Sequence, residues 1–189
     1  WGKSTAMLCA AIKGYNERWC QYPYPVATNV AGIEGGMEYP MITFNGYRPE
    51  KFEPDEDAEV VDNAPDSTYS RRVKYGLVGV IIHEIGHIYF PMTVNSDERQ
   101  WTWMDEGINS FLDYVSALEW EENYPSYAPH TNVLDYIPEE MLGEDQVPIM
   151  TQSDSVLNLG YNAYTKPTAA LIILRETVMG RELFDFAFK

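Results

Sequence analysis

Two histidines four residues apart, with an acidic residue directly after the first, are the clearest chemical signal in the chain. They stand in the run His83-Glu84-Ile85-Gly86-His87. On a helix, residues i and i+4 lie on the same face, so both imidazoles can reach one metal ion. Glu84 projects about 100° round the helix from His83, where its carboxylate can polarise a metal-bound water without binding the metal. Taken alone, the motif also suits two ordinary helix histidines.

A third ligand is expected further along the chain. Catalytic zinc sites commonly use two histidines and one carboxylate and keep a fourth position open. Eighteen residues separate His87 from Glu106, which stands in Trp103-Met104-Asp105-Glu106-Gly107. Two antiparallel helices would return Glu106 to the histidines; otherwise it is a first-turn acid that complements a helix dipole. The sequence predicts one Zn²⁺ per chain, bound by His83, His87 and Glu106.

The elements that must position these residues are mostly helical. Apolar residues at helical spacing predict four long helices, with Gly180 ending the last of them and a further helix after it. Two short apolar runs before the first histidine predict strands. The predicted helices are Ser4–Trp19, Val73–Phe90, Trp103–Glu122 and Thr165–Val178, and the predicted strands are Val26–Ile33 and Met37–Phe44. This order predicts an α+β fold with a small strand element before the metal-binding helix.

Two polar segments are predicted to be loops. Tyr47–Arg72 is crowded with acidic residues, which favours a solvated surface loop over a calcium-binding or regulatory segment. Asn123–Ser155 is rich in Pro, Tyr and Asp. We expect it to be loop with one short helix near Pro138–Leu142.

The composition limits the classes of partner. The chain has 189 residues and a formal net charge of −16, which argues against nucleic acid because phosphate binding needs clustered Lys and Arg. No apolar run is long enough to span a bilayer. Cys9 and Cys20 would lie about 16 Å apart on the first helix, too far for a disulfide. We expect them to be packing residues.

Four motifs together resemble those of the gluzincin zinc aminopeptidases, the family of aminopeptidase N and the leukotriene hydrolase. The zinc-helix motif, the eighteen-residue gap and the Trp-x-x-Glu-Gly surround of Glu106 are similar to that family in order and spacing. The family's G-x-M-E-N strand motif resembles Gly35-Gly36-Met37-Glu38-Tyr39, whose Glu38 stands 45 residues before His83. Its Tyr-x-Lys-Gly element resembles Tyr164-Thr165-Lys166-Pro167, which begins 58 residues after Glu106.

The resemblance implies a peptide-hydrolysing, thermolysin-like catalytic domain over residues 1–189, as part of a longer multidomain chain. It further implies that Glu38 binds the free α-amino group of a peptide substrate, from a substrate-binding strand that includes Gly35–Met37. It also implies that Tyr164 stabilises the oxyanion. Tyr161, one turn earlier, is the competing candidate, and a buried aromatic pair is the plainer interpretation of both tyrosines.

The chain departs from the family pattern at several positions. Tyr39 and Asp105 each replace an asparagine, Pro167 replaces a glycine, and Pro91-Met92 stand where the family usually has Gly-Asn. None of these changes removes a metal ligand or Glu84, the expected general base. Two alternatives to an aminopeptidase stay open: a thermolysin-like endopeptidase, in which Glu38 does not select a free N-terminus, and a zinc domain that binds peptides without cleaving them.

Overall fold

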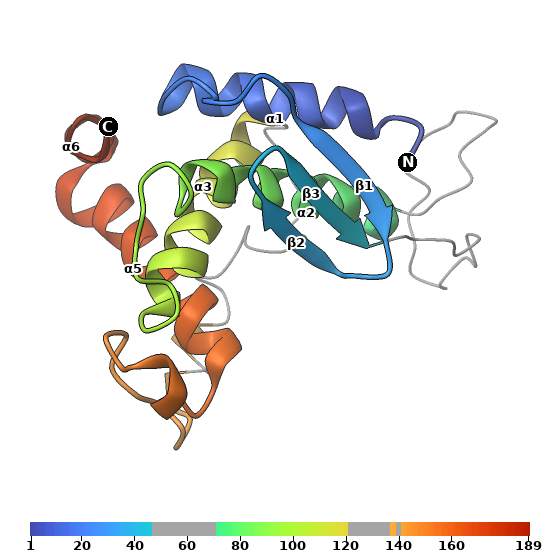
Figure 1. The fold of residues 1–189 in the computed structure, drawn as a ribbon. Helices are drawn as coiled ribbons and strands as arrows, with labels where there is room; N and C mark the ends of the chain where they lie inside the picture. Colours follow the sequence, from blue (N-terminus) through green and yellow to red (C-terminus); the bar gives the residue numbers. More distant parts are fainter. Residues whose placement is uncertain (47–70, 121–136, 139–140) are drawn as a thin grey trace.

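The computed structural model describes residues 1–46, 71–120, 137–138 and 141–189, and they form an α+β fold, as the sequence predicts (Figure 1). A small three-stranded sheet lies beside a set of packed helices. The α-helices and strands are α1 Ser4–Arg18, β1 Thr28–Gly32, β2 Gly36–Tyr39, β3 Ile42–Gly46, α2 Arg71–Tyr89, α3 Ile108–Trp120, α5 Lys166–Ile173 and α6 Arg181–Phe188. The remaining helical turns are η1 Trp103–Gly107, η2 Ser153–Ser155, η3 Tyr161–Thr165 and η4 Leu174–Met179.

The sheet has one strand more than expected. Its order is β1-β3-β2, with β1 parallel and β2 antiparallel to β3, so the prediction of a single strand over Met37–Phe44 was wrong. Pro40 and Met41 separate β2 from β3. Proline cannot donate a ladder hydrogen bond, and Met41 adopts a φ of 70°, a combination that suits a type II turn. As a result β2, which carries Glu38, is an edge strand of the described sheet.

Helices α1 and α2 agree with the prediction to within two residues at each end. α1 ends at Arg18, and α2 runs from Arg71 to Tyr89, just before Phe90 and Pro91. Proline lacks the N–H that a helix interior needs, so Pro91 stops α2. The apolar faces of both helices enter the core, whose largest fully buried side chains include Tyr15, Tyr75, Ile81, Ile85 and Tyr89.

Two of the predicted helices begin with a π-helical turn. The helix predicted at Trp103–Glu122 starts as η1 and continues as α3. The helix predicted at Thr165–Val178 starts earlier, as η3, and passes through α5 into a second π-helical stretch, η4. Gly180, with a φ of 81°, ends it as expected, and α6 follows. π-Helical turns are rare and frequently mark functional sites; here η1 carries Glu106 and η3 carries Tyr164.

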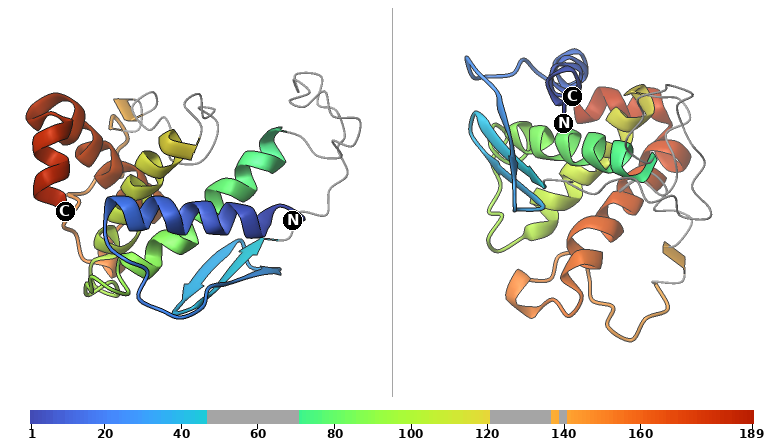
Figure 2. Two further views of the ribbon diagram at one scale, coloured as in Figure 1. Left: turned by 90° about the horizontal axis from the view of Figure 1, so that it is seen from above. Right: turned by 90° about the vertical axis from the view of Figure 1, so that its right-hand side faces the viewer.

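The elements stack in a simple order that places α2 at the centre. The sheet packs on α2, α2 packs on α3, and α3 packs on α5, while α1 runs across α2 and α3 (Figures 1 and 2). η1 lies against η3, which joins two segments far apart in the sequence. The His83–His87 motif on α2 is therefore flanked by β2 on one side and by η1 and α3 on the other.

Both cysteines are exposed, so the expectation that they are packing residues was wrong. Cys9 lies on the side of α1 away from its buried residues Met7, Ala11 and Tyr15, and Cys20 follows the end of that helix. In the described part of the chain, no helix combines the length and the hydrophobicity that a membrane span needs.

The two predicted loops lie partly outside the described residues. Of Tyr47–Arg72, the structure describes only the last two residues, which begin α2. Of Asn123–Ser155, it describes Ile137 and Pro138, both helical, and the chain from Met141 onward. The N–H of Met141 donates to the carbonyl oxygen of Ile137 at 2.9 Å, which agrees with a short helix there.

Candidate metal centre

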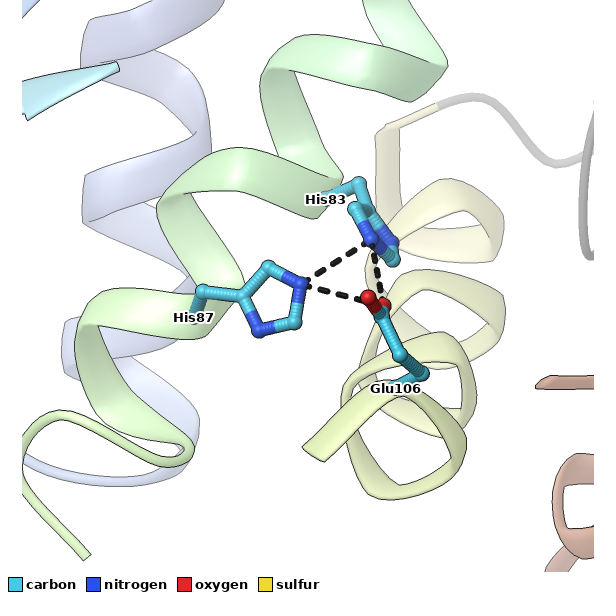
Figure 3. A group of neighbouring side chains, drawn as sticks. All are labelled: His83, His87 and Glu106. Carbon is cyan, nitrogen blue, oxygen red and sulfur yellow. Dashed lines mark hydrogen bonds and ion pairs between the residues drawn. The ribbon is translucent and has the colours of Figure 1, made fainter. Parts of the chain in front are cut away.

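Three donor atoms from α2 and η1 meet at one point. Nε2 of His87 lies 3.0 Å from Nε2 of His83, and each of these nitrogens lies 3.2 Å from Oε2 of Glu106 (Figure 3). The two histidines are one helical turn apart on α2. Because α3 packs along α2, the turn η1 that leads into α3 returns Glu106 to them. The structure thus brings together the three residues predicted as ligands.

The other ring nitrogen of each histidine faces an acceptor. Nδ1 of His83 lies 2.7 Å from Oδ2 of Asp113. Nδ1 of His87 lies 3.1 Å from the carbonyl oxygen of Phe90 and 3.0 Å from Oδ1 of Asp105. A carbonyl or a carboxylate can only accept, so each Nδ1 carries a proton and donates it. Each Nε2 then has a lone pair to offer to the shared centre.

This donor set fits a zinc ion. Tetrahedral bonds of about 2.0–2.1 Å hold three donors about 3.3 Å from one another, close to the 3.0–3.2 Å found here. Three acceptors that face one another repel unless a cation or a proton lies among them. The acceptors behind the rings are also the kind that orient metal-binding histidines. His83, His87 and Glu106 are therefore suited to hold a divalent metal.

The carboxylates around the centre favour positive charge within it. Burial alone would lower the pKa of His83, but Asp113 and Glu106 outweigh burial and raise that pKa to about 10. Burial would raise the pKa of Glu106, yet hydrogen bonds and charges from the two histidines hold it well below its ordinary value. The site therefore stabilises positive charge, whether protons or a metal ion carry it.

Glu84 lies beside the cluster of His83, His87 and Glu106 and is not part of it. It is 3% exposed, and burial raises its pKa to about 7 although the neighbouring histidines act to lower it. Its Oε2 atom is buried and has no hydrogen-bond partner among the described residues. A buried carboxylate with a pKa near neutrality is suited to accept a proton and to give it back.

Tyr164 reaches the same centre from η3. Its ring stacks on the ring of His83, with centroids 6.1 Å apart and planes at 22°, and its side chain hydrogen-bonds Glu106. Burial, followed by the charge of Glu106, raises the pKa of Tyr164, so the hydroxyl keeps its proton and serves as a donor. Tyr161 is buried one turn earlier. The contacts with His83 and Glu106 place Tyr164 at the centre.

Of the strand motif Gly35–Tyr39, only part lies near the cluster of His83, His87 and Glu106. Glu38 on β2 lies near His87 and Asp105, with one possible ligand atom of each within 4.8 Å of the others, and burial raises its pKa. Met37 is exposed and, as the residue directly before Glu38 on the strand, points to the opposite face. Gly35 supports the sheet, since its carbonyl oxygen accepts the N–H of Gly46 at 2.9 Å.

Close contacts between α2, α3 and α1 hold the histidines in place. Nδ2 of Asn109 donates to the carbonyl oxygen of His83 at 2.8 Å. A Cβ added at Gly86 would collide with Oδ1 of Asn109 and would lie 2.7 Å from the hydroxyl of Tyr15. Gly86, between the two histidines, is therefore needed for the close approach of α3 to α2.

Sequence analysis missed Asp113, Asn109 and the contact of Asp105 with His87. Asp113 follows Glu106 by seven residues, about two helical turns along the same segment. Because metal-binding histidines usually donate to a carboxylate or a carbonyl, that spacing is a signal that could have identified Asp113. The partner at Phe90 is a backbone oxygen, for which residue type gives no signal.

No protein-family model matches the chain, and a search of curated protein sequences found no match either. The evidence for a function therefore lies in the residues of the candidate metal centre, in their geometry and in the motifs of the sequence.

Proposed function

We propose that this protein is a zinc-dependent metallopeptidase of the gluzincin type, with a thermolysin-like catalytic domain, that removes N-terminal residues from peptides. The observation that carries the proposal is the meeting of His83, His87 and Glu106 at one point, with the buried Glu84 beside them. The α+β fold, in which a small sheet packs on the metal-binding helix, supports it.

The residues of the centre would have different roles in hydrolysis. His83, His87 and Glu106 would hold Zn²⁺, which when bound lowers the pKa of a water molecule and polarises a substrate carbonyl. Glu84 accepts a proton from the attacking water and later delivers it to the leaving amine. Its burial and its pKa near 7 suit both transfers.

Tyr164 and Glu38 would contact the substrate. The hydroxyl of Tyr164 donates a hydrogen bond to the carbonyl oxygen as negative charge develops there. The carboxylate of Glu38 pairs with the substrate's α-ammonium group. Because β2 is an edge strand of the described sheet, its outer backbone groups can pair with the main chain of an extended peptide. This arrangement favours peptides with a free N-terminus.

The experiment compares the wild type with Glu84→Gln on a panel of fluorogenic aminoacyl substrates. The wild type should lose activity to a chelator and regain it with Zn²⁺. Glu84→Gln should keep its zinc but lose about a hundredfold or more in kcat, because an amide cannot accept the proton. Glu17→Gln, the same change on an exposed part of α1, should alter neither zinc content nor kcat.

Two results would contradict the proposal in different ways. A near-normal kcat in zinc-replete Glu84→Gln would exclude Glu84 as the general base. If the wild type binds zinc and peptides but cleaves neither the fluorogenic panel nor any peptide of greater length, the result would favour a non-catalytic peptide-binding domain.

A further inference from the structure

The backbone of β2 approaches Glu84 so closely at Gly36 that no side chain fits between them. A Cβ added at Gly36 would collide with Oε1 of Glu84 and would lie 3.1 Å from its Cδ and 3.2 Å from Cγ2 of Val80. At the neighbouring Gly35, an added Cβ meets nothing within 4 Å. Of these two glycines, only Gly36 therefore has to lack a side chain.

The register of the sheet explains why Gly36 faces the metal-binding helix. Gly36 pairs with Asn45 and Glu38 pairs with Thr43 across β2 and β3, and residues directly opposite one another lie on the same face of a sheet. Asn45 and Thr43 are buried, and both strands pack on α2. The same face of β2 thus directs Glu38 towards the ligands and places the bare backbone of Gly36 over Glu84.

We propose that Gly36 is a positioning residue for Glu84, an inference that rests on the proposed role of Glu84 as general base. With no side chain at position 36, the edge strand covers the carboxylate and keeps it beside the histidines. A methyl group there would displace the end of the Glu84 side chain, which is flexible, more readily than it would displace the strand or the helix. The fold and the zinc ligands would remain while the proton acceptor moved away from the reacting water.

The first test compares Gly36→Ala with Gly32→Ala, the same change elsewhere in the sheet. At Gly32 the added Cβ meets Cδ1 of Phe44 at 3.7 Å, an ordinary contact. Gly36→Ala should lower kcat about a hundredfold, as a displacement of about 1 Å in a catalytic group can. Its KM and zinc content should stay within about twofold of the wild type, whereas Gly32→Ala should leave kcat unchanged as well. Equal kcat in the two variants would overturn the inference.

A second arm needs no enzymatic activity and separates this inference from the proposed function. The melting temperature is measured for Gly36→Ala in the wild-type background and in a Glu84→Ala background, both zinc-free. Because Glu84→Ala removes the colliding atoms, Gly36→Ala should lower the melting temperature less in that background. If Gly36→Ala lowers the melting temperature equally in the two backgrounds, and the wild type cleaves no peptide, both the role of Gly36 and the peptidase function are rejected. If the two shifts differ while the wild type is inactive, the contact between Gly36 and Glu84 stands and the peptidase function is rejected.

Discussion

Nδ1 of His83 lies 2.7 Å from Oδ2 of Asp113, a buried residue on α3, the helix that continues from the turn carrying Glu106. One continuous helical segment therefore carries both Glu106, a proposed metal ligand, and the carboxylate that faces Nδ1 of His83, another proposed ligand. Oδ1 of Asp113 in turn lies 3.5 Å from the hydroxyl of Tyr15 on α1. The centre is thus linked to three helices, which limits the movement of its donors.

Asp113→Asn should weaken zinc binding about 10- to 100-fold, the usual cost of losing the partner of a metal-binding histidine. The amide lacks the charge that stabilises the Nδ1 proton of His83, and its NH₂ group can face that nitrogen instead. Competition with a chelator of known affinity measures the change. Asp154→Asn is the matched control, since Asp154 is exposed and pairs with Arg99 on the surface. An unchanged zinc affinity in Asp113→Asn would remove Asp113 from the centre.

The parts that the sequence predicts well are those set by local periodicity. The spacing of His83 and His87 places both on one face of a helix, and the apolar pattern around them places that helix in the core. Pro91 and Gly180 end their helices for reasons of backbone geometry alone. Periodicity alone does not predict that Glu106 lies near the histidines, however. Its position depends on the packing of α3 along α2, for which the sequence offers only the spacing of the motifs and their resemblance to the gluzincin pattern.

The parts that the sequence does not predict depend on contacts between distant segments or on unusual turns. A π-helical turn shifts the faces of the residues that follow it, so a search for α-helical spacing does not show that η1 and η3 are π-helical. The turn at Pro40 and Met41 contains no glycine, so in the sequence β2 and β3 look like one longer strand. The closeness of Gly36 to Glu84 exists only once β2 has packed on α2.

Tyr164→Phe should lower kcat about a hundredfold or more, the usual cost of losing one oxyanion donor. Its zinc content should stay unchanged, because the hydroxyl is not a ligand. Tyr161→Phe is the comparison, since it removes a buried hydroxyl one turn away on the same segment. Steady-state kinetics on one aminoacyl substrate distinguishes the two. A larger loss in Tyr161→Phe would transfer the donor role to that residue.

Acetylation of the N-terminus should remove most cleavage of a short peptide by the wild type. Only a free α-ammonium group can pair with Glu38, and such a charge-assisted contact is stronger than a neutral hydrogen bond. Glu38→Ala should raise KM for the free peptide and narrow the gap between the two substrates. Mass spectrometry of the products identifies the bond that is cut. Internal cleavage of the acetylated peptide, as fast as trimming of the free one, would establish the endopeptidase alternative.

Glu84 should make the stability of the zinc-free protein fall as the pH rises from about 4.5 to about 7. Burial raises its pKa from 4.5 to about 7, so the folded state binds this proton more tightly than the unfolded state does. The contribution is complete below the unfolded pKa and is lost as the pH rises through the folded pKa, with a limit of about 3 kcal/mol.

Urea unfolding at pH 5 and pH 8 measures this contribution. Glu84→Gln, which cannot titrate, should lose less free energy of unfolding than the wild type between the two pH values. His83, whose pKa is raised from 6.5 to about 10 on folding, also makes stability fall over this range, but it is present in both proteins, so the difference between them reports Glu84. Parallel changes in the two proteins would show that burial does not raise the pKa of Glu84.

The most direct test of the zinc centre is the zinc content of the purified protein after dialysis against a weak chelator. The wild type should retain about one zinc per chain, the stoichiometry of a single catalytic site. His87→Ala and Glu106→Ala should each retain much less, because two donors are left where three met within 3.0–3.2 Å. Undiminished zinc in both variants, or none in the wild type, would contradict the assignment of His83, His87 and Glu106 as the metal ligands.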